Sequence, residues 1–284
     1  MKGITAFVCF LISINNLSAA ADYAGGQLSL LVYNTHGLPA LLAGDDPKAR
    51  FPAIAKLTDS YALSLLQEDF AHHDLLVTHL NEPANVIRGV DAGFPKCWLC
   101  SSSGLTVISR LSKSGWRVRT AFQPFTTCSG WFTRLNDCFA QKGFQLSAVE
   151  NAAGKLVYVV NTHLDAGTSA DDRTARSAQL KQIAKAIEAT AKDKALIFAG
   201  DLNLNWDDTE DHALLQSFAA SLDLILAQKG GEASSGWKIL DYIYFRSGDS
   251  ADLTLLHAGE DKAFSNKDGT LSDHPALFAR FAIQ

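Results

Sequence analysis

The sequence predicts an α/β fold built as one large domain. Short apolar runs with the length of buried strands recur along the chain, and segments whose apolar residues repeat at helical spacing lie between them. No linker rich in proline, glycine or serine, no internal repeat and no low-complexity tract divides the chain. We therefore expect residues 22–284 to form a single α/β domain, a size within the range of such domains.

The first 21 residues have the features of a secretory signal peptide. Lys2 supplies the positive start, Ala6 to Ile14 form a mostly apolar core, and the small residues 18–21 offer a cleavage site. This core is too short for a bilayer span, which needs about 20 apolar residues. No later segment of the sequence is long and apolar enough either. We therefore expect an exported protein, periplasmic or extracellular, without a transmembrane segment.

The charge of the expected mature chain argues against a general polyanion binder. Without Lys2, 24 basic residues face 30 acidic ones, which gives a net charge of −6. An acidic surface repels nucleic acids. A nuclease that relies on a metal ion or on a local basic patch remains compatible with this composition.

Four cysteines follow the predicted leader, and an even number in an exported chain favours disulfides. Three pairings are possible, and the local one, Cys97–Cys100 with Cys128–Cys138, is preferred. Metal ligation by the four thiols is the alternative. It is disfavoured because the spacings, CWLC and C-x9-C, do not repeat a zinc pattern.

Two buried strands and two helices are expected before residue 80. Pro47 suits the first turn of a helix, and Phe51, Ile54 and Leu57 recur at helical spacing after it. Polar residues follow each strand directly. The expected elements are a strand at Gln27–Tyr33, a helix at Asp46–Ser60, a strand at Tyr61–Leu66 and a helix at His72–His79.

The middle of the chain reads as strands. The turn sequence Asn151–Gly154 separates two apolar runs, which predicts a hairpin. The expected strands are Leu105–Ser109, Trp116–Phe122, Phe144–Val149 and Leu156–Val160.

The clearest helix of the sequence is Asp171–Ala191. Leu180, Ile183 and Ile187 recur on one face, and the acidic residues at its start suit the helix dipole. The remaining expected elements are a strand at Ala195–Ala199, a helix at Asp211–Ala220, a strand at Ile239–Phe245 and a closing strand at Ala276–Ala282.

Carboxylates, amides and histidines lie at the ends of six of these strands. One such segment taken alone, GDLNLN (Gly200–Asn205), is explained by a strand and an Asx turn. Their joint occurrence instead indicates an active site at one edge of the sheets, because open α/β folds carry their chemistry at strand ends. Carboxylate and amide oxygens suit Mg²⁺ better than Zn²⁺. The residues are Asn34, Glu68, His163, Asp165, Asp201, Asn203, Asp241, Asp273 and His274.

Six motifs together resemble the endonuclease/exonuclease/phosphatase (DNase I-like) superfamily, in its order and spacing and over nearly the whole expected mature chain. The resemblance implies a four-layer α/β sandwich of two packed, mostly antiparallel sheets flanked by helices. The motifs are YNTHGLP (Tyr33–Pro39), LLQEDF (Leu65–Phe70), NTHLDAG (Asn161–Gly167), GDLNLN, LDYIYF (Leu240–Phe245) and SDHPALF (Ser272–Phe278).

The resemblance also implies a metal-dependent hydrolysis with named roles. Glu68 is the principal Mg²⁺ ligand, Asn34 lies beside it, and Asp273 supports the metal side; Mn²⁺ or Co²⁺ are possible substitutes. Asp201 and Asn203 orient the attacking water and the phosphate.

A pair of residues would activate that water. His274 is the general base, and Asp241 holds its imidazole. His163 donates to the phosphoryl oxygens, and Asn205 remains a turn residue.

Within the superfamily the chain is most similar to secreted and neutral sphingomyelinases. The evidence is N-x-x-G-L-P after the first strand, THLDAG followed by Asp172, Arg176 and Gln179, and the tract Cys128–Gly130 with a downstream KGF (Lys142–Phe144). Arg176 and Gln179 are expected to make structural helix–loop hydrogen bonds. The segment from Arg246 to Leu271 is mostly polar, unlike the aromatic hairpin of the bacterial enzymes. Phe94, Trp98, Trp131 and Phe132 are either a substitute apolar lip or buried core.

Three functions are weighed on this basis. The first is a secreted, monomeric, Mg²⁺-dependent phosphodiesterase that acts on a phospholipid head group at a membrane surface, as a sphingomyelinase does. The second is a secreted DNase I-like nuclease, for which Arg110, Lys113, Arg117 and Arg119 are the nearest to a basic cluster. The third is an inactive binding module, which the presence of the complete residue set disfavours.

Overall fold

The computed structural model describes residues 26–38, 46–91, 101–130, 137–231, 239–266 and 269–284. The predicted leader, Cys97, Cys100 and the four aromatic residues of the expected lip (Phe94, Trp98, Trp131 and Phe132) lie outside these ranges. Among the described residues, none of the helices combines the length and apolarity that crossing a bilayer requires.

The first sheet has six strands in the order β11-β14-β1-β2-β4-β3. Strands β1 and β2 run parallel, and the other neighbours in this sheet are antiparallel. Its strands are β1 (Gln27–Asn34), β2 (Leu63–Gln67), β3 (Asn85–Arg88), β4 (Thr106–Ser109), β11 (Leu253–Glu260) and β14 (Leu277–Ile283).

The second sheet also has six strands, in the order β5-β6-β7-β8-β10-β9. Here β7 and β8 are the parallel pair. Its strands are β5 (Arg117–Pro124), β6 (Gly143–Glu150), β7 (Leu156–His163), β8 (Ala195–Asp201), β9 (Ile225–Lys229) and β10 (Asp241–Arg246), while β12 (Ser265–Asn266) and β13 (Gly269–Thr270) form a separate short hairpin.

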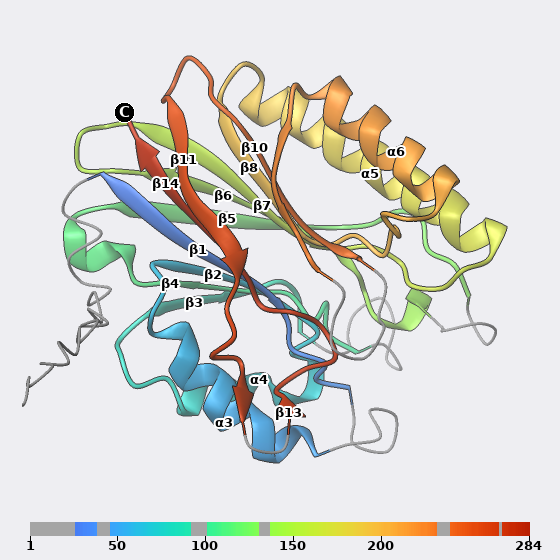
Figure 1. Cartoon of the computed structure of the whole chain (residues 1–284), viewed down its shortest axis with the longest axis horizontal. Coiled ribbons are helices and arrows are strands. Elements are labelled where there is room, and N and C mark those ends of the chain that lie inside the picture. The colour runs from blue at the N-terminus through green and yellow to red at the C-terminus, as the bar shows by residue number, and fades with distance from the viewer. Residues whose placement is uncertain (1–25, 39–45, 92–100, 131–136, 232–238, 267–268) are drawn as a thin grey trace, which may run out of the picture.

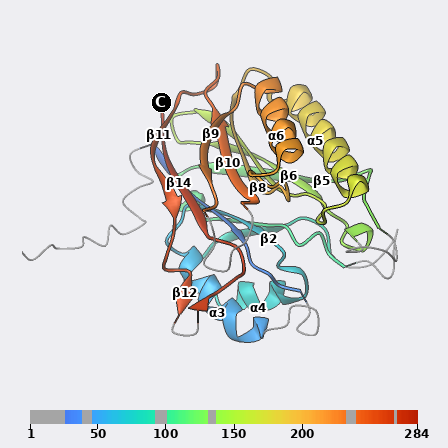
Figure 2. The same ribbon diagram turned by 45° about the vertical axis from the view of Figure 1, so that its right-hand side comes forward.

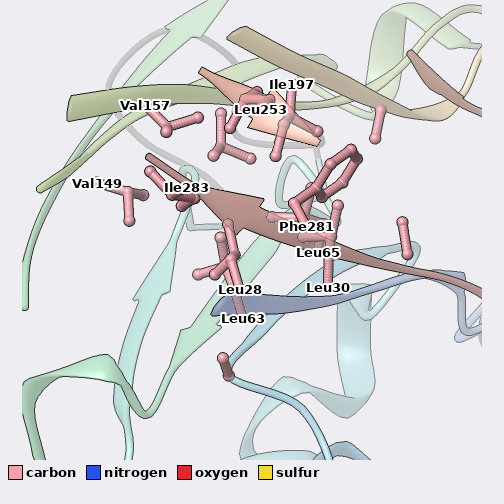
Figure 3. Packing of buried hydrophobic residues seen from close by; sticks show 14 of the residues in the cluster. Leu28, Leu30, Leu63, Leu65, Val149, Val157, Ile197, Leu253, Phe281 and Ile283 are labelled. Carbon is pink, nitrogen blue, oxygen red and sulfur yellow. The ribbon is translucent and has the colours of Figure 1, made fainter. Parts of the chain in front are cut away.

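The two sheets pack face to face, and helices cover their outer faces (Figure 1). Apolar side chains of both sheets fill the space between them, and residues such as Leu30, Leu65 and Ile197 have no exposed surface (Figure 3). Burying such side chains stabilises the fold by about 1.5–3 kcal/mol for each one.

One helical pair covers each sheet (Figure 2). Helices α3 (Pro47–Thr58) and α4 (His73–Thr78) lie over the first sheet, and α5 (Ala170–Ala191) and α6 (Thr209–Ser221) lie over the second. The four-layer α/β sandwich is therefore confirmed. Three short 3₁₀ segments complete the described elements: Phe70–His72, Leu111–Ser114 and Asp137–Phe139.

Local sequence explains where the helices begin. Asp46 accepts a hydrogen bond from the Lys48 amide at the start of α3, where Pro47 occupies the first turn. Ser169 and Asp172 form a capping box at the start of α5, with each side chain accepting from the other residue's backbone N–H. The helices predicted from apolar periodicity are confirmed to within a few residues.

Five strands were not predicted from the sequence, namely β3, β9, β11 and the two short strands β12 and β13. The first three lie at sheet edges, where one side of the strand faces solvent and the apolar alternation is weak. In β11 the register also shifts between Leu255 and His257, which breaks the period of two. Edge strands with such bulges carry little of the signal on which strand prediction depends.

The Cys128–Cys138 disulfide is present, as the local pairing predicts, with a distance of 1.98 Å between the two sulfur atoms. It closes a short loop next to the end of β7. The Ser129 amide, within this loop, donates to Asp165 Oδ2 at 2.6 Å. The disulfide loop is thereby attached to the segment that follows His163.

Candidate active site

The two parallel strand pairs end at the same edge of the molecule and bring the predicted residues together. Asn34 closes β1, Glu68 follows β2, His163 closes β7 and Asp201 closes β8. Asn34 joins the two sheets, because its Nδ2 donates to Glu68 Oε1 at 3.1 Å and to Asp201 Oδ2 at 2.9 Å. A single amide thus fixes the separation of the two carboxylates.

Unusual backbone conformations aim these side chains. Glu68 and Asn203 have φ angles of 58° and 49°, in the left-handed region that few residues adopt. Gly200 has a φ of 142°, and a Cβ atom there would lie 2.0 Å from the Thr162 carbonyl oxygen. Strands β7 and β8 therefore approach so closely at their ends that only glycine fits. Such outliers cost about 1–3 kcal/mol each and cluster at functional sites.

His274 and Asp241 form the pair that the motifs predict. His274 Nδ1 lies 2.8 Å from Asp241 Oδ2, and its Nε2 lies 3.8 Å from Asp201 Oδ2. The side chains of His274 and Asp241 are 9% and 2% exposed, so the contact is shielded from water. With Nδ1 committed to Asp241, Nε2 is the ring atom that is left to exchange a proton.

Burial and mutual charge set the protonation of this pair. Burial would lower the pKa of His274, but the negative fields of Asp241 and Asp201 outweigh it and raise that pKa well above 6.5. Burial raises the pKa of Asp241 to about 6, while the charge of His274 opposes the rise. The raised pKa of His274 favours the imidazolium, so the ring must lose this proton before it can act as a general base.

His163 has a different environment from the one its expected role requires. Its Nε2 lies 3.1 Å from the Nζ of Lys142. An ammonium group can only donate, so Nε2 accepts this hydrogen bond and the proton of the neutral ring is on Nδ1. In this arrangement His163 Nε2 is an acceptor, and the predicted donation to a phosphoryl oxygen from that atom requires Lys142 to move away.

The charges around His163 agree with a neutral ring. Burial lowers its pKa well below 6.5, and the nearby positive charges of Lys142 and His274 lower it further. Burial alone would lower the pKa of Lys142, but the carboxylates of Asp137 and Asp165 raise it. Lys142 is therefore the cation of this side of the site, and it makes a 2.7 Å ion pair with Asp137.

Lys142 is a neighbour of the candidate site to which the motifs assign no role. It is 4% exposed at the side chain, and its Nζ also donates to the Leu164 carbonyl at 2.8 Å. In the sequence, the KGF tract supports only the resemblance to sphingomyelinases. The signal that marks Lys142 is its burial beside His163. This contact becomes visible only in the folded structure.

Other predicted residues take positions around this centre. Asn203 Nδ2 donates to the Leu164 carbonyl at 3.0 Å, and its amide donates to Asp201 Oδ1 at 2.9 Å. Asp273 lies 3.3 Å from His36 Nδ1 and belongs to neither of the two carboxylate–histidine clusters found among the described residues. Its support of the metal side stays a prediction. The described residues show no hydrogen bond or ion pair between Asp273 and Glu68.

Three further predicted structural roles agree with the contacts. Asn205 Oδ1 accepts from the Asp207 amide at 3.4 Å, the contact of an Asx turn. Arg176 donates to the carbonyls of Asp165 and Gly167, and Gln179 Oε1 accepts from the Asp165 amide. Both α5 residues therefore hold the loop after His163.

The donor set fits a hard divalent cation. Ligand atoms of Glu68, His163 and Asp201 lie within 4.8 Å of one another. Glu68 Oε2 is buried and has no hydrogen-bond partner among the described residues, and burial raises the pKa of this carboxyl. A buried, unpartnered carboxylate oxygen is costly unless a cation or a proton compensates for it. Glu68, with Asn34 and Asp201 beside it, would hold Mg²⁺.

Comparison with known families agrees with this geometry. The model of endonuclease/exonuclease/phosphatase family 2 matches residues 59–227. The chain belongs to this family. The matched range contains Glu68, His163, Asp201 and Asn203. The other predicted site residues, Asn34, Asp241 and His274, lie outside that range, and the fold brings them to the same edge.

Related proteins of this family were found by sequence. Sphingomyelinases of Mycobacterium tuberculosis and Mycobacterium bovis are 27% identical over 273 residues, which cover 90% of this chain and 53% of theirs. The chain thus spans about half the length of the curated relatives it matches.

Solved structures of the same fold were found as well. Sphingomyelinase C from Streptomyces griseocarneus has a TM-score of 0.65 at 21% identity, covering 89% of this chain and 99% of that one. A Staphylococcus aureus beta toxin mutant with bound magnesium ions has 0.65 at 16%, with 89% and 99% covered. D. rerio TDP2 with a single-strand DNA product has 0.65 at 18%, with 90% and 98% covered. These likenesses extend the endonuclease/exonuclease/phosphatase fold to nearly the whole chain.

Proposed function

We propose that the protein is a secreted, Mg²⁺-dependent phosphodiesterase that hydrolyses the head group of a phospholipid, releasing phosphocholine from sphingomyelin. The observation that carries this proposal is the convergence of Glu68, Asp201 and the His274–Asp241 pair in two adjoining clusters that share Asp201. The mycobacterial sphingomyelinases, at 27% identity over most of this chain, favour the lipid substrate.

The residues of this cluster divide the reaction between them. His274 Nε2 takes a proton from the attacking water, and the water oxygen forms a bond to phosphorus as the bond from phosphorus to the ceramide oxygen breaks. Asp241 keeps the imidazole oriented and stabilises the imidazolium that results. Asp201, 3.8 Å from Nε2 at its Oδ2, positions the water opposite the leaving oxygen. The departing alkoxide takes a proton from solvent, and the imidazolium returns its own proton to solvent.

Charge that builds up on the phosphoryl oxygens needs compensation from positive groups. Lys142 supplies one cation, at 3.1 Å from His163. A bound Mg²⁺ would act as a Lewis acid on a phosphoryl oxygen. The beta toxin structure with bound magnesium ions supports the choice of metal. Glu68 and Asn34 would hold that ion, and Mn²⁺ or Co²⁺ would be possible substitutes.

A paired assay tests substrate and metal together. We expect purified protein with Mg²⁺ to release phosphocholine from sphingomyelin liposomes, to lose this activity in EDTA, and to regain it with Mg²⁺, Mn²⁺ or Co²⁺. Plasmid DNA is offered in parallel. Cleavage of DNA without release of phosphocholine would contradict the lipid assignment and favour the nuclease.

The role of the base is tested in the same assay. His274→Ala should reduce the rate by roughly 10²–10⁴-fold. His257→Ala is the matched control, because this histidine lies on the edge strand β11 and packs on Phe278. Undiminished activity of the His274 variant would overturn the mechanism.

The alternative function is a secreted nuclease with the same catalytic residues. The fold shared with TDP2 in complex with a DNA product keeps it open. On β5, Arg117 and Arg119 are exposed, although Arg117 is paired with Glu150. Reversing both arginines to glutamate should weaken salt-dependent DNA binding if this edge carries nucleic acid. Unchanged affinity would contradict such a surface.

Export and oligomeric state have their own measurements. We expect the mature protein to begin at Ala21 or Asp22, after cleavage behind Ala20 or Ala21, which N-terminal sequencing of exported protein would reveal. We expect a monomer by light scattering. Retention of the leader in exported protein would contradict the signal peptide.

A further inference from the structure

The backbone ladder between β1 and β14 ends before it reaches the active site. The last paired residues are Val32 and Leu277, two residues short of Asn34. Beyond this point Pro275 has no N–H to donate. The segment that carries His274 therefore separates from the segment that carries Asn34. This happens just where His274 must be held in register with Asn34.

Two short segments face each other there. We call Asn34–Gly37 the metal-side loop and Leu271–His274 the base-side loop. Among the described residues, no backbone–backbone hydrogen bond joins one loop to the other. Side chains make the connection instead, and the central one is Arg50 of α3.

Arg50 binds carbonyl oxygens of both loops. Its Nη1 donates to Thr35 O at 3.0 Å and to Leu271 O at 2.5 Å, and its Nη2 donates to His36 O at 2.9 Å. The first and third of these oxygens belong to the metal-side loop, and the second belongs to the base-side loop. The planar guanidinium suits this task, because its fixed donors fork toward several acceptors at once.

One of these carbonyls belongs to His36, which lies in a strained turn that a strong hydrogen-bond donor can stabilise. His36 has a φ of 49°, in the left-handed region, and its amide donates to Asn34 Oδ1 at 2.9 Å. This turn presents Asn34 to Glu68 and Asp201. Arg50 stabilises the turn from the other side, so its hydrogen bonds act on the residue that fixes the distance between the carboxylates.

Two further side-chain contacts join the same loops as Arg50. Ser272 Oγ donates to Asn34 O at 2.7 Å, and Asp273 Oδ2 lies 3.3 Å from His36 Nδ1. Both join the same two loops. These contacts give Ser272 and Asp273 of the SDH motif a connecting role, while His274 performs the chemistry.

We propose that Arg50 is a positioning residue that couples the base-side loop to the metal-side loop and so sets His274 in register with Asn34 and the residues that would hold Mg²⁺. It acts on the site through the three carbonyls. This proposal rests on the proposed function, because it assigns Arg50 to the same site. A displacement of about 1 Å at such a site costs on the order of 10²-fold in rate.

Arg246 provides a matched control. It also donates to three backbone carbonyls, namely Lys194 O at 3.1 Å, Leu222 O at 2.7 Å and Ala191 O at 2.9 Å. It lies at the far end of β10 from Asp241, and it therefore joins segments remote from the site. Replacing either arginine by methionine removes the same chemistry, a guanidinium that holds three carbonyls.

The experiment compares Arg50→Met, Arg50→Lys and Arg246→Met in the full chain. Calorimetric titration with Mg²⁺ alone measures metal affinity without substrate, and kcat and KM are measured at saturating Mg²⁺. We expect Arg50→Met to weaken Mg²⁺ binding about 10-fold and to lower kcat by about 10–100-fold with little change in KM. Arg50→Lys should be intermediate, since one ammonium cannot reproduce the fork. Arg246→Met should leave both quantities unchanged.

Each outcome supports or overturns the positioning role of Arg50. If Arg50→Met loses stability but keeps the Mg²⁺ affinity and kcat of Arg246→Met, Arg50 is merely structural and the proposal is overturned. If Arg50→Met does not fold, Arg50→Lys carries the comparison with the same criteria. If the wild type binds Mg²⁺ but cleaves no phospholipid, the proposed substrate fails, whereas the Mg²⁺ affinities of the variants still judge the coupling.

Discussion

Asp241 Oδ2 lies 2.8 Å from His274 Nδ1, and this contact joins residues of β10 and of the segment before β14, which belong to different sheets. The contact fixes the ring with Nε2 toward Asp201. It also determines how the activity should depend on pH, because the charge of Asp241 is a main cause of the raised pKa of His274.

The acid limb of the pH–rate profile should move when Asp241 loses its charge. His274 must be neutral to accept a proton, so activity rises as the pH passes upward through the His274 pKa, which lies above 6.5 before metal binds. Asp241→Asn removes one of the anions that raise this pKa while burial still lowers it. We expect the limb in kcat/KM to shift to lower pH and the maximal rate to fall by roughly 10²–10⁴-fold. Asp252→Asn, at an exposed position, is the control, and an unmoved limb would contradict the assignment.

Burial of the Glu68 carboxylate should lower the stability of the metal-free protein. Burial raises the pKa of this carboxyl, so the folded state holds its proton more tightly than the unfolded chain. In EDTA the stability contributed by this group therefore falls as the pH rises above about 4.5. Glu68→Gln removes that loss. In EDTA at pH 8 the variant should therefore melt at a higher temperature than the wild type, and the difference should be smaller at pH 5.

The same variant should lose the response to metal. Mg²⁺ is expected to raise the melting temperature of the wild type, because a ligand that binds only the folded state stabilises it. Glu68→Gln should show no such increase, and Glu82→Gln, an exposed control, should respond as the wild type does. A Glu68→Gln variant that Mg²⁺ stabilises as much as the wild type would exclude Glu68 as the principal ligand.

The buried ion pair between Lys142 and Asp137 should show strong coupling in a double-mutant cycle. The side chains are 4% and 7% exposed and their charged atoms lie 2.7 Å apart. Lys142→Met leaves a buried carboxylate without its cation, which costs about 3–5 kcal/mol. Adding Asp137→Asn should restore much of that loss in denaturant unfolding. The exposed pair Lys113–Glu82 is the control and should show no measurable coupling. Additive losses at Lys142 and Asp137 would contradict the pair.

Reduction of Cys128–Cys138 should destabilise the fold. The bond joins cysteines ten positions apart and so lowers the conformational entropy of the unfolded chain. This stabilises the folded state by about 2–3 kcal/mol. We expect Cys128→Ser/Cys138→Ser to melt at a lower temperature than the wild type, and reductant to have little further effect on it. If reductant lowers the melting temperature of this variant as much as that of the wild type, the dominant disulfide lies elsewhere in the chain.

The sequence was sufficient for the elements that depend on local patterns. Helix α5 was predicted because Leu180, Ile183 and Ile187 repeat at helical spacing, and β8 was predicted from its apolar run. The polar residues that follow buried strands gave the candidate site, because a strand end is a local feature. The edge strands β3, β9 and β11 were missed, since strands exposed on one side lose the apolar pattern.

The sequence by itself determined the chemistry that is present: the carboxylates, amides and histidines, and the motifs that assign the chain to its family. Only the tertiary structure decided which of them meet, because those contacts span long separations. Asn34 and Asp201 are 167 positions apart, yet one hydrogen bond of 2.9 Å joins them. The same holds for Lys142 beside His163 and for Arg50 between the two loops. Local periodicity carries no information on contacts that exist only once two sheets have packed.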